Sequence, residues 1–145
     1  MLDREASPRE PQPIVRGESR YPPQLLELHD PPPQLYVRGQ GLDLLGRPMV
    51  ALVGARACSG YAQSVASNVG RAVAEAGFVV VSGLARGVDS AAHRGALEST
   101  GATIAVLGCG VDVTYPKRNV ELAKCVGRRG LLISEDPDGT PAAPF

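Results

Sequence analysis

From Val50 onward, apolar and polar positions alternate in two regular patterns. Short runs that are almost entirely apolar are typical of buried strands, and they occur at residues 50–54, 78–83, 102–108 and 130–135. The segments between these runs predict helices, and in the first of them alanines and valines recur at helical spacing; the ranges are 62–76, 89–99 and 117–128. Strands that are apolar on both faces and alternate with helices indicate the α/β class. We therefore predict a Rossmann-like, doubly wound and mostly parallel sheet, covered on both faces.

The N-terminal part of the chain lacks this regularity. Eight of the thirteen prolines lie within the first 33 residues, among charges of both signs, and this composition resists regular structure. We expect residues 1–20 to be a disordered or poorly ordered arm. A short helical turn at 25–28 and a brief strand at 35–37 should follow, and the tail at 136–145 should fray.

Composition limits the possible partners of the 145-residue chain. Fifteen basic and fifteen acidic residues give a formal net charge of zero, so any anion site must come from local clustering. Three widely spaced cysteines, Cys58, Cys109 and Cys125, lack the spacing of a zinc site and fit a reducing cytoplasm. No apolar run approaches the roughly 18 residues of a membrane helix, and the first twenty residues do not resemble a signal peptide. These features predict a cytoplasmic protein with no membrane partner.

The loop after the first regular strand has the composition of an anion site. In doubly wound sheets, ligands bind beyond the carboxyl ends of the strands. Gly54 permits close approach of the backbone, Ser59 precedes a helix whose N-terminus offers free N–H groups, and Arg56 adds donors suited to phosphate. The alternative is structural, with Gly54 serving a tight turn and Arg56 pairing with a carboxylate.

Two further loops repeat this chemistry. Gly83 and Arg86 follow the second regular strand, and Tyr115, Lys117 and Arg118 follow the third. Arg86 alone has a structural interpretation, because arginine is common in glycine-rich loops. Lys117 and Arg118 stand at the start of a helix, where cations oppose the helix dipole, so stability alone does not explain them. Because three loops bring basic groups to one edge of the sheet, we favour a functional anion site over three separate structural roles.

Other polar and aromatic residues have two interpretations each. Asp89 and His93 are four residues apart and could form an acid/base pair, but a helix N-cap and a packed histidine explain them better. Tyr61 and Tyr115 could stack on nucleobases or pack in the core.

The motifs of several enzyme classes are absent or incomplete. "GLDLLGRP" has the glycine spacing of a P-loop, but Arg47 and Pro48 replace the required lysine and hydroxyl residue. "GCGVDV" begins a dinucleotide fingerprint, yet Val113 occupies the third glycine position. No nucleophile elbow or HExxH motif occurs. We therefore predict no catalytic residues, no metal site and no cofactor.

Several motifs together resemble the DNA-processing protein A family, also called DprA or Smf. They are "YPPQLLELHDPPPQLYVRG", "VGARACSGYA" and "VSGLARGVDSAAHRGALESTGATIAVLGCGVDVTYPKRNVEL", and the resemblance spans residues 21–145. It implies an extended Rossmann-like DNA-processing domain without known catalysis. Such a domain binds single-stranded DNA and helps to load a RecA-type recombinase during natural transformation. By motif, the residues bordering the DNA phosphate pocket would be Arg56, Ser59, Tyr61, Gly83, Arg86 and Lys117.

The chain departs from the family pattern at its C-terminal side. The family continues beyond the position of Phe145 into an "FPxRNR" segment and further elements that supply homodimer and recombinase contacts. We therefore expect residues 21–145 to form a partial domain, with the recombinase and the homodimer as partners of the full-length family.

Two alternatives to DNA binding remain open. One is a nucleotide-handling enzyme of the lysine-decarboxylase-like phosphoribohydrolase type, although its "PGGxGTxxE" motif is absent before Phe145. The other is an inactive truncated fragment.

Overall fold

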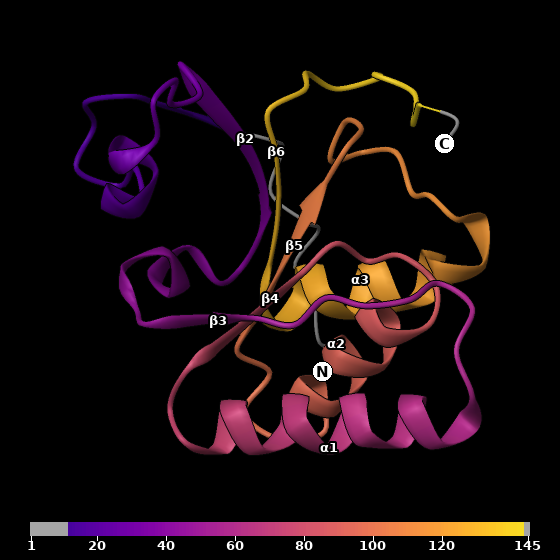
Figure 1. The fold of residues 1–145 in the computed structure, drawn as a ribbon. Helices are drawn as coiled ribbons and strands as arrows, with labels where there is room; N and C mark the ends of the chain where they lie inside the picture. Colours follow the sequence, from indigo (N-terminus) through magenta and orange to yellow (C-terminus); the bar gives the residue numbers. More distant parts are fainter. Residues whose placement is uncertain (1–11, 144–145) are drawn as a thin grey trace, which may run out of the picture.

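The computed structural model describes residues 12–143, which form a six-stranded sheet and three α-helices (Figure 1). The strand order is β1-β2-β6-β5-β4-β3. The four strands of the regular pattern pair in parallel, and their bounds are β3 (Met49–Ala51), β4 (Val79–Ser82), β5 (Thr103–Leu107) and β6 (Leu131–Ser134). The connecting helices are α1 (Gly60–Glu75), α2 (Val88–Leu97) and α3 (Val120–Arg129). The α/β, mostly parallel, Rossmann-like fold class is confirmed.

Two antiparallel strands extend the sheet on the β6 side. β2 (Gln34–Gly39) pairs with β6, and β1 (Gln12–Val15) pairs with β2. The expected disordered arm is therefore wrong for residues 12–20, because β1 covers 12–15 and the Arg16 N–H in the turn that follows donates to the Pro33 carbonyl at 2.9 Å. The first eleven residues of the arm lie outside the described part of the chain. Ile14 is fully buried in the core, and β1 is an edge strand, where Pro13 is tolerated. The apolar gain from burying Ile14 outweighs the poor strand composition of this segment.

The two faces of the sheet are covered by different elements, α-helices on one and 3-10 turns on the other. Side chains of β4 and β6 alternate between faces, and on one face Val80 packs with α2 and Leu132 packs with α3. On the opposite face, Ile104 and Leu131 pack against Leu44 and other residues of two N-terminal 3-10 turns, η1 (Pro23–Glu27) and η2 (Leu42–Gly46). Figure 1 shows these turns, in indigo and purple, across the sheet from the three helices. Within residues 12–143, then, the α-helices lie on one face rather than on both as expected.

Glycines allow α1 and α2 to pack with their backbones almost in contact. A Cβ on Gly70 would collide with the carbonyl of Ala92, and a Cβ on Gly95 would collide with the carbonyl of Ser67. This contact fixes α2 relative to α1. It thereby positions the two loops that lead into these helices.

The C-terminal tail packs against the domain instead of fraying. The Gly139 N–H donates to the Asp112 carboxylate at 2.8 Å, and the Gly110 N–H donates to the Thr140 carbonyl at 2.9 Å. Ala142 packs against the apolar cluster under α3. The expectation that 136–145 frays is wrong for residues 136–143, because these contacts with the β5–α3 loop are long-range and leave no local sequence signal. Residues 144 and 145 lie outside the described part of the chain.

None of the helices within residues 12–143 is both long enough and apolar enough to cross a membrane.

Candidate functional site

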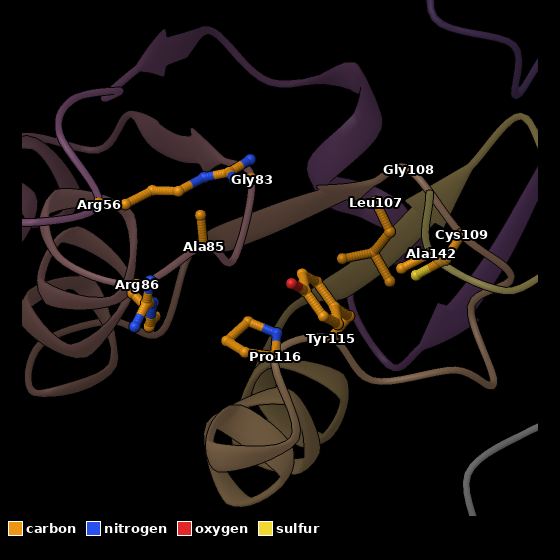
Figure 2. Close-up of a pocket in the computed structure, with 10 residues that line it drawn as sticks. All are labelled: Arg56, Gly83, Ala85, Arg86, Leu107, Gly108, Cys109, Tyr115, Pro116 and Ala142. Atoms are coloured by element: carbon orange, nitrogen blue, oxygen red, sulfur yellow. The ribbon is translucent and has the colours of Figure 1, made fainter. Parts of the chain in front are cut away.

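A pocket of about 100 Å³ opens at the carboxyl ends of β4 and β5 (Figure 2). We call it the cationic pocket, and the residues that line it are Arg56, Gly83, Ala85, Arg86, Leu107, Gly108, Cys109, Tyr115, Pro116 and Ala142. Loops after three different parallel strands contribute to it. Its place at the carboxyl edge of the sheet is where α/β folds bind ligands.

The pocket has a cationic side and an apolar side. Figure 2 shows Arg56 and Arg86 on one side, with Arg56 extending toward Gly83. On the other side, Leu107 and Ala142 form an apolar wall. Such a combination suits a ligand that joins an anionic group to an apolar or aromatic group.

Tyr115 and Pro116 lie between these two sides (Figure 2). The Tyr115 ring is 53% exposed, and its hydroxyl points toward the cationic side. An exposed aromatic ring beside cationic groups can stack on a nucleobase without displacing core packing. Of the two interpretations of Tyr115, the structure therefore excludes simple core packing.

The first two loops are tied together through their backbones. The Val88 N–H donates to the Ala55 carbonyl at 3.2 Å. Gly87 adopts a φ of +77°, and a Cβ there would collide with the Ala55 carbonyl and crowd the Arg56 backbone. Only glycine fits this approach. The tie holds Arg56 and Arg86 at the same pocket although they are 30 residues apart in the sequence.

Gly54, Ser59 and Tyr61 are near this loop but do not line the pocket. A Cβ on Gly54 would lie 2.8 Å from the Val88 side chain, so the glycine lets the loop pack on the start of α2. The Ser59 hydroxyl accepts a hydrogen bond from the Ala62 N–H at 3.1 Å and caps α1. Tyr61 is 81% exposed on the first turn of α1.

Lys117 also lies just outside the pocket lining. It begins the 3-10 turn η3 (Lys117–Asn119), directly after Pro116 of the pocket wall. Among the described residues, no hydrogen bond or ion pair engages the side chains of Arg86, Lys117 or Arg118. The structure therefore brings Arg56, Gly83 and Arg86 together, with Lys117 on the neighbouring loop.

Asp89 and His93 do not form an acid/base pair. Asp89 is not the N-cap, because α2 begins at Val88; its carboxylate instead accepts hydrogen bonds from the N–H groups of Gly83 at 3.1 Å and Ala85 at 3.4 Å. His93 is fully buried and bonds through Nδ1 to the Thr103 hydroxyl at 2.7 Å. Burial lowers the pKa of His93 from 6.5 to about 4, and the charge of Asp89 opposes this shift only in part. The imidazole is neutral at pH 7 and packs in the core.

Cys109 is a pocket residue that the sequence analysis did not assign to the site. Burial raises the pKa of its thiol, and the carboxylates of Asp136 and Asp112 raise it further. The thiol donates to the Val113 carbonyl at 3.3 Å. A thiol of this kind stays protonated and is a poor nucleophile. Its position after β5 was a usable signal, whereas Ala142 came from a tail expected to fray.

The chain matches the family model "DNA recombination-mediator protein A" over residues 12–145. It is 45% identical over 125 residues to DNA processing protein DprA of Streptococcus pneumoniae, covering 86% of this chain and 44% of that protein. It is 32% identical over 127 residues to the Bacillus subtilis protein of the same name, covering 88% of this chain and 43% of that protein. The matched part thus spans less than half of the length of either relative.

Solved structures of DNA processing protein A are similar to this fold. The crystal structure of S. pneumoniae DNA processing protein A has a TM-score of 0.86 at 41% identity, over 94% of this chain and 48% of that one. The structure of the Helicobacter pylori protein has a TM-score of 0.80 at 32% identity, over 91% of this chain and 59% of that one. The H. pylori structure was described for its single-stranded DNA binding mode.

Proposed function

Because this chain belongs to the DNA recombination-mediator protein A family, we propose that it binds single-stranded DNA through the cationic pocket. The observation that carries the proposal is the convergence of Arg56 and Arg86, from two different loops, on one cavity at the carboxyl edge of the sheet. Two guanidinium groups at one cavity suit a backbone phosphate, because each offers several donors in a planar fork.

The rest of the pocket fits the other parts of a nucleotide. Gly83 and Ala85 leave space beside the arginines because neither carries a large side chain, and the Tyr115 ring offers a surface on which a base can stack. In this proposal Lys117 contacts the next phosphate along the strand. Gly54, Ser59 and Tyr61 shape and flank the loop that carries Arg56.

The strength of binding follows from the number of phosphates engaged. Three cations, Arg56, Arg86 and Lys117, would neutralise about three phosphates and give a log–log salt slope of about −2 for a single strand. A neutral chain adds no long-range attraction to this local site.

A phosphoribohydrolase activity has less support. Near the pocket, the Asp89 carboxylate is engaged by the N–H groups of Gly83 and Ala85, and the pKa of the Cys109 thiol is raised. His93 is buried and neutral. We therefore propose binding without catalysis. We also propose a cytoplasmic location. Recombinase loading and homodimerisation are proposed as well, but no described residue is assigned to either contact.

Replacement of Arg56 tests the assignment of the pocket. We expect Arg56→Ala to weaken binding of a fluorescein-labelled oligothymidine about tenfold, because one charge-assisted phosphate contact contributes about 1.4 kcal/mol. Fluorescence anisotropy at 50 mM salt measures this change, and circular dichroism checks that the domain remains folded.

The matched control is Arg128→Ala, which removes the same charge from an exposed position on α3. It should leave the affinity within twofold of the wild type. Equal loss in the two variants would mean that only net charge matters and would refute the pocket assignment.

A further inference from the structure

Resting on the proposed function, we infer that Asn119 is a positioning residue that ties two DNA-binding loops together and sets the geometry of the cationic pocket. One loop carries Gly83 to Arg86 after β4, and the other carries Tyr115 to Lys117 after β5. The two loops are about 30 residues apart in the sequence, and both supply residues to the pocket lining.

The side chain of Asn119 makes two hydrogen bonds to the first loop and to the helix that follows it. Its Nδ2 donates to the Leu84 carbonyl at 2.9 Å and to the Ser90 hydroxyl at 3.0 Å. Asn119 is 3% exposed, so both amide protons are used away from water. The Ser90 hydroxyl in turn donates to the Ala85 carbonyl. One amide group therefore controls two successive carbonyls beside Arg86.

The position of Asn119 in its own helix makes this arrangement unusual. It occupies the N-cap position of α3, where an asparagine ordinarily bonds to a free N–H of the first turn. Here the side chain makes no capping hydrogen bond. Its donors point instead to the loop after β4, so the contact joins the two loops at the expense of the usual helix cap.

The loop that Asn119 holds needs external support. Leu84 has a φ of +60°, a left-handed conformation that a branched side chain rarely adopts, and its side chain is fully buried. Asp89 holds the N–H groups on either side of Leu84, and Asn119 holds its carbonyl. Without Asn119, the loop loses the contact that fixes its distance from Tyr115 and Lys117.

A double-mutant cycle distinguishes positioning from general stability. We expect Asn119→Ala to weaken oligothymidine binding about fivefold in the wild-type background and less than twofold in the Arg86→Ala background. The effect shrinks because Arg86 is no longer present to be positioned. In the Arg128→Ala background the fivefold effect should be retained. An equal loss in all three backgrounds would mean that Asn119 only stabilises the fold and would overturn the inference.

Hydrogen exchange supplies a readout that does not need DNA. In Asn119→Ala, amide exchange should accelerate in residues 83–87 and stay unchanged in α1, whereas unchanged exchange in 83–87 would overturn the tie. If Asn119→Ala does not fold, Ser90→Ala replaces it, because this variant removes the link to the Ala85 carbonyl. Exchange in residues 83–87 should again accelerate, and unchanged exchange there would again overturn the tie. If the wild-type protein fails to bind DNA, the proposed function falls, while the exchange result still decides whether the tie exists.

Discussion

At the scale of single residues, burial decides the roles of two titratable side chains. Asp89 and His93 are four apart on α2, and both are nearly or fully buried. Asp89 is stabilised by two backbone N–H groups, whereas His93 has one neutral hydroxyl partner. The pair therefore serves the architecture of the loop and the core rather than proton transfer.

The buried histidine predicts a dependence of stability on pH. The pKa of His93 is lowered from 6.5 to about 4 in the folded state, so the unfolded chain binds the proton more tightly. This contribution to stability is fully present above pH 6.5 and is lost as the pH falls toward 4. Between pH 7.5 and pH 5 the wild type should lose about 2 kcal/mol of unfolding free energy from this group.

Urea unfolding of wild type and His93→Gln at these two pH values measures the effect. The variant should lack most of the pH-dependent loss, and His29→Gln, which replaces an exposed histidine, should retain it. The same loss in His93→Gln and wild type would show that other groups cause the pH dependence.

At the scale of elements, the packing of α1 on α2 places both arginine-bearing loops. Gly95→Ala should destabilise the domain by about 1–3 kcal/mol, because its Cβ would collide with the Ser67 backbone and force the helices apart. Thermal or urea unfolding measures the loss. Gly127→Ala on α3 is the matched control, since its Cβ would make only an ordinary contact at 3.9 Å with Leu132. A control as unstable as Gly95→Ala would show that the cost lies in helix glycines generally.

Most elements could be predicted from the sequence because their signals are local. Uninterrupted apolar runs located the four parallel strands, and alanines and valines at helical spacing located α1. β1 was missed because its pairing partner β2 is distant and Pro13 argues against a strand. The prediction that Asp89 caps α2 was wrong, because its carboxylate accepts a hydrogen bond from the Gly83 N–H in the preceding loop.

From the sequence, we could predict only those site residues that lie in loops directly after a parallel strand. Arg56, Gly83 and Arg86 come together because parallel strands end at one edge. Asn119 gave no signal, because its function depends on contacts with a loop about 35 residues away in the sequence. Long-range hydrogen bonds of this kind do not impose a period on the sequence.

At the scale of the whole molecule, a formally neutral chain concentrates positive charge at one edge. Two arginines line a single cavity, and Lys117 and Arg118 follow on the adjacent turn. Zero net charge weakens long-range steering, so attraction to DNA should be short-ranged and confined to this edge.

The most direct test is the salt dependence of oligothymidine binding for the wild type and the Arg56→Ala, Arg86→Ala double variant. Phosphate contacts by three cations predict a log–log slope of about −2 for the wild type, or roughly 20-fold weaker binding at 200 mM than at 50 mM salt. Loss of two contacts should reduce the slope to about −0.7. Equal slopes for the two proteins would contradict the claim that this pocket holds the DNA backbone.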